Sequence, residues 1–419
     1  MRFINQSLIT ICLVAILSNL TIVFSQTNTM ETDLALVGAK IYPSPKASPI
    51  IGGVVLIRNG KITAVGKKGK IKIPSRAKVI DCKGLILTSG FWNNHVHFIE
   101  TIWENSATIP ASKLTQQLQV MLTKYGFVTV FDTGSVWAET NAIRRRIESG
   151  EIQGPRIFTV GEILSQKGGL SPELLKSAGF LSDAVIEVSG QKDGEEKSRQ
   201  HVKKDVDAVK IYAATYFRGL VEMSPVTLEA IVKESRRGGK LVFVHPYNQN
   251  GAEAAINAGI DVFAHTLSNG KFTNNQLKRM KRQRIALIPT LRLWKVEAGR
   301  EGMSVSETEE FINSGVKQLR DYSKIGGQIL FGTDVGYIDY DPTEEYIFME
   351  QAELSFRQIL ESLTTAPAKR FGLSKTTGKI ARGMDADIVL LSNDPATDVK
   401  AFSSVRYTIR AGKIIYQSD

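Results

Sequence analysis

Short apolar runs separated by longer amphipathic stretches dominate the middle of the chain. Eight such runs follow one another, at residues 85–89, 128–131, 156–160, 208–209, 241–244, 261–264, 285–288 and 329–333. Most have the length and the Val, Ile and Phe content of buried strands. Helix signals lie between them: Ser224 precedes a stretch that ends at Gly238, and Ser304 with Glu307 forms a capping box. This alternation predicts an α/β fold, a (β/α)8 TIM barrel over residues 86–375.

Both ends of the chain have a different pattern, in which short β-like runs are separated by turn residues. These runs lie at residues 35–38, 54–58, 61–65, 387–391, 405–409 and 413–416. Asn59-Gly60 joins the second run to the third and is a strong signal for a two-residue hairpin. The two ends, residues 26–85 and 376–419, are therefore predicted to pack together as one small β-sandwich. The segment 162–207 is predicted to be a loop-rich insertion near the barrel mouth, either a lid or a surface excursion.

Residues 1–25 have the pattern of an export signal. Arg2 is the only charged residue before Glu31, and an apolar run at residues 8–23 precedes small residues. The run is shorter than the ~20 residues that a membrane-spanning helix needs. We therefore predict cleavage near Ser25, no stable membrane insertion afterwards, and a bacterial protein that is periplasmic or secreted.

Cysteine content and net charge indicate whether disulfides form and which classes of molecule the protein binds. Loss of Cys12 with the signal leaves Cys82 alone, so the mature chain has no internal disulfide, which suits a large periplasmic domain. The formal net charge of +11 is compatible with an anionic surface or an acidic substrate. The densest basic run, residues 278–284, resembles the solvated face of a helix and has no interleaved aromatic residues. We therefore expect a small-molecule substrate and no nucleic acid, and leave a homo-oligomer open.

Four of the five histidines stand at the ends of apolar runs, together with one lysine and one aspartate. His95 and His97 follow the first run two residues apart, and side chains at i and i+2 of a strand point to the same face. The remaining members of the set are Lys210, His245, His265 and Asp334. Imidazole nitrogens directed at one point are ligands that Zn²⁺ prefers. The repeated strand-end position therefore predicts a common metal centre.

The segments that carry these residues resemble the amidohydrolase superfamily, in the branch with imidazolonepropionase-like and prolidase-like enzymes. The resemblance covers nearly everything after the signal. It rests on an ordered set of motifs, NHVH at 94–97, VKI at 209–211, VHP at 244–246, AHT at 264–266, GTDVG at 332–336 and GKIARGMDADIV at 378–389. The order of the set makes it specific, whereas each motif alone is not.

The resemblance implies a role for each residue of the set. His95, His97 and Asp334 correspond to ligands of one divalent metal ion, and His245 and His265 to ligands of a second, with zinc expected at both. Lys210 corresponds to a bridging lysine that CO₂ carboxylates, since a lysine desolvated at the barrel mouth has a lowered pKa. The implied reaction is metal-dependent hydrolysis of an amide-type C–N bond, with Asp334 as the catalytic acid–base group.

Two tyrosines lie close to these residues in the sequence. Tyr212 and Tyr247 are candidates for substrate contacts, although buried barrel aromatics are equally common. Asn93 departs from the resemblance, because the family usually has an acidic residue two positions before the first histidine of the pair. The substrate stays open among dipeptides, N-acyl amino acids and cyclic amides. Esterase, lactonase or phosphotriesterase activity is the alternative, and a non-catalytic binding protein is the less favoured reading because no expected ligand is missing.

Overall fold

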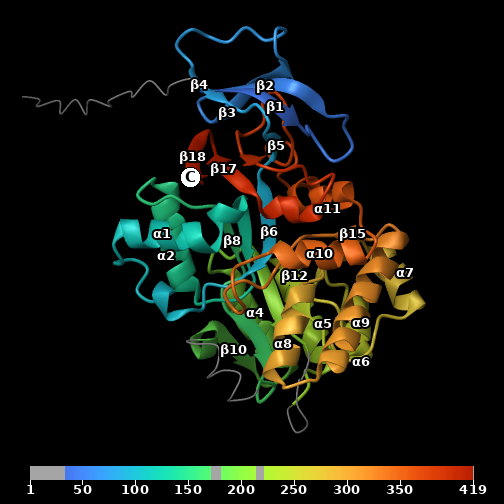
Figure 1. Cartoon of the computed structure of the whole chain (residues 1–419). Helices are drawn as coiled ribbons and strands as arrows, with labels where there is room; N and C mark the ends of the chain where they lie inside the picture. The colour runs from blue at the N-terminus through green and yellow to red at the C-terminus, as the bar shows by residue number, and fades with distance from the viewer. Residues whose placement is uncertain (1–33, 171–180, 214–220, 419) are drawn as a thin grey trace, which may run out of the picture. The chain divides into compact units, whose positions relative to one another are not determined.

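The chain is described by a computed structural model over residues 34–170, 181–213 and 221–418 (Figure 1). Its middle part contains parallel strands in two ladders. The first ladder has three strands, β6 (Phe91–Val96), β7 (Phe127–Asp132) and β8 (Arg156–Thr159). The second has seven, in the spatial order β10 (Val185–Val188), β9 (Ile163–Gln166), β11 (Ala208–Tyr212), β12 (Leu241–His245), β13 (Val262–Ala264), β14 (Ala286–Ile288) and β15 (Gln328–Ile329).

Individual backbone hydrogen bonds connect the two ladders. Asn94 of β6 donates to the carbonyl of Phe331, just after β15, over 2.8 Å. Asp207, which leads into β11, donates to the carbonyl of Thr159 at the end of β8, also over 2.8 Å. The predicted α/β architecture with parallel strands is therefore confirmed. A closed eight-stranded barrel is not shown, because the two ladders remain separate sheets.

Helices follow most of these strands and cover them (Figure 1). In chain order they are α1 (Ala111–Met121), α2 (Trp137–Glu148), α4 (Gln191–Val202), α5 (Pro225–Arg237), α6 (Gln249–Ala258), α7 (Asn274–Gln283), α8 (Leu291–Arg300), α9 (Val305–Lys324), α10 (Thr343–Gln351), α11 (Phe356–Leu363) and α12 (Thr365–Arg370). Short 3₁₀ turns lie at η1 (Thr101–Trp103), η2 (Thr123–Tyr125), η3 (Leu181–Ala184) and η4 (Val399–Ser403).

The helix starts that have local signals are confirmed. The side chain of Ser224 caps the start of α5, and Gly238 is the C-cap residue that follows its last residue, Arg237. Thr273 and Ser304 each form a complete capping box, for α7 and α9 respectively. In such a cap the side chain of the N-cap residue accepts from a backbone N–H group three residues later, which has no partner inside the helix. The signal is therefore local and can be recognised in the sequence.

Both chain ends contribute to one eight-stranded sheet. Its order is β18 (Lys413–Gln417), β17 (Val405–Arg410), β16 (Ile388–Leu391), β5 (Ile86–Ser89), β1 (Leu34–Ile41), β2 (Ile50–Arg58) and β3 (Lys61–Lys67), with β4 (Lys78–Asp81) pairing with β1. The Asn59-Gly60 hairpin is confirmed, with φ of 49° and 71° at its two central residues. The predicted β-sandwich is not confirmed, because β16 pairs with β5 and so unites strands from both ends in a single sheet.

The segment 162–207 was predicted to be loop-rich, but its described parts, residues 162–170 and 181–207, contain regular structure, while residues 171–180 lie outside the described residues. Strands β9 and β10 pair in parallel within it, and α4 follows them. The sequence pattern did not predict α4 because this helix is almost entirely polar. Its buried face carries small or polar residues instead of an apolar stripe. Ser198 of this face lies 3.1 Å from the hydroxyl of Ser235 on α5.

Aromatic side chains from both ladders meet in one core. Phe131 of β7 packs against Phe243 of β12 with ring centroids 4.8 Å apart, and against Phe371 at 4.9 Å. Trp92 of β6 stacks on Phe158 of β8 at 5.7 Å. Phe131 and Phe243 belong to different ladders, so side chains of both ladders pack in the same core.

The predicted export signal, residues 1–25, lies outside the described residues. Among the described residues, none of the helices combines the length and the apolar character that crossing a membrane requires.

Candidate metal centre

The strands bring most of the predicted site residues to their carboxyl ends, and Lys210 is the exception. His95 is the fifth residue of β6, and His245 is the last residue of β12. His265 follows β13 directly, and Asp334 follows β15 in the loop beyond it. Lys210 lies in the middle of β11, in register with Phe243 of β12. The C-terminal edge of parallel strands is where α/β proteins place ligands and catalytic groups.

Three side chains of the set converge closely. The Nε2 atoms of His95 and His97 are 3.2 Å apart, and they lie 3.1 Å and 2.9 Å from Oδ1 of Asp334. That oxygen makes no hydrogen bond of acceptable geometry although two ring nitrogens stand next to it. Ligand atoms about 3.3 Å from one another are what tetrahedral zinc requires, given Zn–N bonds of about 2.0–2.1 Å. The residues present therefore fit a metal ion.

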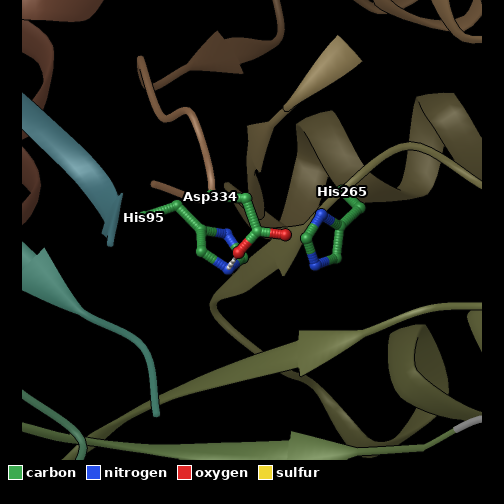
Figure 2. Close-up of side chains that lie close together, drawn as sticks. All are labelled: His95, His265 and Asp334. Atoms are coloured by element: carbon green, nitrogen blue, oxygen red, sulfur yellow. Dashed lines mark ion pairs between the residues drawn. The ribbon is translucent and has the colours of Figure 1, made fainter. Parts of the chain in front are cut away.

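His265 and His245 extend the cluster on one side. The ring of His265 lies 4.5 Å from that of His95 and 4.4 Å from that of His245, between centroids. Ligand atoms of His95, His265 and Asp334 all lie within 4.8 Å of one another. Figure 2 shows the Asp334 carboxylate between the two imidazole rings. These five side chains therefore form one contiguous cluster, and Lys210 lies close enough to lower the pKa values of His95 and His245.

Burial controls the protonation of these groups. It lowers the pKa of His95 to about 3 and the pKa of Lys210 to about 8, while Asp334 opposes both shifts. Burial and neighbouring positive charge hold the pKa values of His245 and His265 well below the usual range. Burial alone would raise the pKa of Asp334, but His95 and His97 hold it well below its ordinary value. Burial would lower the pKa of His97, but Asp334 and the Gly134 carbonyl raise it. Neutral imidazoles and an ionised carboxylate are the forms that bind metal ions, so any proton on the Nε2 atom of His97 has to leave when an ion binds.

Comparison with known proteins agrees with this geometry. The sequence profile of the amidohydrolase family matches residues 86–415. The chain belongs to the amidohydrolase family. It is accordingly a hydrolase that acts on carbon–nitrogen bonds, as predicted from the motifs.

Individual relatives of this amidohydrolase are distant but similar over most of their length. An ochratoxinase of Aspergillus niger is 22% identical over 428 residues, which cover 92% of this chain and 88% of that protein. The crystal structure of a Xaa-Pro dipeptidase with bound methionine matches with a TM-score of 0.78 at 21% identity, over 92% of this chain and all of that one. The A. niger ochratoxinase structure matches with a TM-score of 0.75 at 19% identity, over 92% of this chain and 96% of that one.

In this amidohydrolase a hydrogen-bond network behind His97 sets the orientation of the ring. His97 Nδ1 donates to the carbonyl of Gly134 over 2.7 Å, so its Nε2 keeps the lone pair that faces the centre. Asp132 accepts from the backbone N–H of Gly134 over 3.3 Å and from the hydroxyls of Ser135 and Thr159 over 2.5 Å and 2.6 Å. Asp132 was not among the predicted site residues, although it directly follows the apolar run 128–131 and the same strand-end signal indicates it.

Asn93 has a defined role in the amidohydrolase site. Its Oδ1 accepts from the backbone N–H of His95 over 3.2 Å, and its Nδ2 donates to the hydroxyl of Thr333 over 2.7 Å. Thr333 directly precedes Asp334, so Asn93 links the backbone segments that carry two of the converging side chains. An acidic residue here would need to be protonated to donate to Thr333.

Of the two predicted tyrosines, Tyr212 contacts the histidine cluster, and Tyr247 is close to it in the sequence. Tyr212 ends β11, and its ring stacks on that of His245 with centroids 4.3 Å apart. Tyr247 stands two residues beyond His245, and its backbone carbonyl accepts from the N–H of Asn269 over 3.0 Å. Their contact with substrate remains a prediction.

Proposed function

We propose that this amidohydrolase holds two divalent metal ions, with zinc best suited to the donor set. His95, His97 and Asp334 would bind one ion, and His245 and His265 the other, with carboxylated Lys210 between them. The observation that carries the proposal is the approach of two ring nitrogens to one carboxylate oxygen without hydrogen-bond geometry. Such an arrangement is expected of side chains that share a cation.

The environment of Lys210 supports its proposed modification. The side chain is buried, and the lowered pKa makes the neutral amine accessible near neutral pH. The amine nitrogen would form a bond to the carbon of CO₂ and lose one proton, which gives a carbamate with two oxygen donors. An unmodified ammonium at this position would repel two adjacent cations.

The chain's own residues then orient the ions and move protons. Two ions in these positions would lower the pKa of a water molecule and polarise the carbonyl of the scissile amide. Asp334 would accept the proton released by the attacking water and deliver it to the leaving nitrogen, because its carboxylate stays ionised inside the cluster. Burial of the surrounding residues excludes bulk water from this step.

The proposed substrate is a small amide: a dipeptide, an N-acyl amino acid or a cyclic amide. The relatives support this range, because one is named as a Xaa-Pro dipeptidase and another as an ochratoxinase. The test is a panel of N-acyl amino acids and dipeptides, with esters and lactones alongside, assayed before and after zinc is removed from the full-length protein. Amide hydrolysis that disappears with zinc and returns on its addition is expected. Hydrolysis confined to esters or lactones, or unaffected by chelation, would contradict the proposal.

Replacing Lys210 tests the bridge directly. Lys210→Ala should lose most of the affinity for at least one ion, by about 10-fold or more, because a ligand shared by both ions is gone. Added acetate or propionate should restore part of the activity by standing in for the carbamate. Lys233→Ala, a change of an exposed lysine on α5, serves as the control. A Lys210→Ala protein with two ions bound as tightly as in the wild type would contradict the bridging role.

A further inference from the structure

A carboxylate on one helix caps the start of another. Glu345 of α10 is fully buried, and its two oxygens accept from the backbone N–H groups of Leu291 over 3.0 Å and Arg292 over 2.8 Å. These are the first two residues of α8. The first N–H groups of a helix have no partner inside it, and a negative charge there is favourable. Glu345 therefore replaces the local cap that α8 lacks.

Thr290 precedes α8 but does not cap it, because its hydroxyl is used elsewhere. Its Oγ1 donates to the carbonyl of Pro289 over 2.8 Å and lies 2.6 Å from Nδ1 of His265. A hydroxyl has a single hydrogen, and a hydrogen bond to the Pro289 carbonyl uses it. In that arrangement Thr290 Oγ1 accepts from His265, with the proton on Nδ1 and the lone pair on Nε2.

The backbone at Thr290 needs outside support. Its φ is +46°, in the left-handed region that a β-branched residue rarely adopts. The next two residues along the chain are the ones held by Glu345. The buried carboxylate thus fixes the helix start that holds Thr290 in this conformation.

The same helix touches His265 a second time, one turn further on. The ring of Trp294 packs against that of His265 with centroids 5.6 Å apart. Its Nε1 donates to the hydroxyl of Thr266 over 2.8 Å, at the residue after His265. A shift of α8 would therefore disturb both the proton acceptor on Nδ1 and the packing of the ring.

We propose that Glu345 is a positioning residue for His265, acting through the start of α8 and the hydroxyl of Thr290. The inference rests on the proposed function in taking His265 as a metal ligand. The buried carboxylate offers two acceptors for two N–H groups. Glutamine has one acceptor oxygen and one NH₂ group, and the NH₂ group cannot accept from the second backbone N–H. Glu345→Gln should therefore leave one N–H at the start of α8 without an acceptor, with little change in side-chain volume.

The first measurement reads the tautomer of His265 without any metal. The protein is measured at about pH 8.5, above the pKa of about 7 to which burial raises the Glu345 carboxyl, so that both of its oxygens can accept. In the metal-free full-length protein, labelled with ¹⁵N at histidine, the wild type should then show His265 as a single Nδ1–H tautomer. Glu345→Gln should give a mixture, because Thr290 is no longer held. Glu344→Gln is the matched control, since it removes the ion pairs of Glu344 with Arg292 and Lys295 between the same two helices and leaves the N–H groups capped. A variant with Glu345→Gln that keeps the single tautomer would overturn the inference.

The second measurement is zinc affinity by competition with a chelator. Glu345→Gln should weaken the binding of one ion by about 10- to 100-fold, the usual effect of losing a group that orients a ligand. Thr290→Val should show the same loss, and Thr290→Ser should keep affinity near that of the wild type. The double variant Glu345→Gln, Thr290→Val should be no weaker than either single change, because both act on one path. Losses that multiply in the double variant would mean that Glu345 acts elsewhere.

The two measurements separate this inference from the proposed function. A folded wild type that binds fewer than two ions contradicts the two-ion proposal, while the tautomer still decides the role of Glu345. If Glu345→Gln does not fold, Glu345→Asp takes its place, because the shorter carboxylate stays ionisable but does not reach both N–H groups. Glu345→Asp with a single tautomer and unchanged affinity would overturn the inference as well.

Discussion

Asp334 combines two proposed roles, as a ligand and as a proton carrier, and one substitution separates them. Asn keeps an oxygen of similar reach but cannot accept a proton at neutral pH. Asp334→Asn should fold and keep most of its metal, while turnover falls by roughly 10²- to 10⁴-fold. Metal content and turnover are measured on the same preparation, with Asp339→Asn, a change at an exposed position, as control.

Other outcomes for Asp334→Asn have distinct meanings. Loss of metal in proportion to the loss of turnover would support the ligand role alone. Full metal content with less than about a tenfold fall in turnover would assign proton transfer to a different residue. His265 would then be the next candidate, because its ring lies in the same cluster.

At the scale of single residues, the sequence indicated which side chains form the candidate metal centre, but not which residues hold those side chains in place. A residue at the end of an apolar run points to the edge where parallel strands meet, so His245, His265 and Asp334 could be found by position alone. Thr290 and Glu345 could not, because Glu345 reaches the start of α8 from 54 residues away and no local pattern specifies that contact.

Between α8 and α10, the buried Glu345 should give the stability of the protein a measurable pH dependence. Burial raises the pKa of Glu345 from 4.5 to about 7, so the folded state binds this proton more tightly than the unfolded state. The stability that the proton contributes is complete below pH 4.5 and is lost as pH rises through 7. Glutamine cannot titrate, so Glu345→Gln lacks this loss.

Denaturant unfolding of the metal-free proteins measures this difference. The free energy of unfolding of the wild type, relative to Glu345→Gln, should fall by on the order of 3 kcal/mol between pH 5 and pH 8. Glu344→Gln should follow the wild type across the same range. A difference between wild type and Glu345→Gln that is independent of pH would show that the carboxyl of Glu345 titrates alike in both states.

Elements with local signals were predicted well, and those that depend on distant partners were not. In each of the caps of α5, α7 and α9, the capping residue and its partner lie within three residues of one another, so the sequence alone locates the helix start. The pairing of β16 with β5 joins opposite ends of the chain, and alternating polarity does not name a strand's partner. Helix α4 has few large apolar residues, so its periodicity gave no signal.

For the whole molecule, the N-terminal pattern predicts export and processing. The mature protein should begin near Gln26, because the apolar run before it has the length and flanks of a cleaved signal. Mass spectrometry of the protein purified from its native host checks this. An intact chain that retains Met1 or Arg2 would contradict the prediction, and the metal chemistry would be unaffected.

The number of metal ions bound per chain tests the central claim most directly. Full-length wild-type protein is equilibrated with zinc, freed of unbound metal and analysed for metal and protein in the same sample. We expect two ions per chain, held by His95, His97, Lys210, His245, His265 and Asp334. A folded, active protein that binds one ion or none would contradict it.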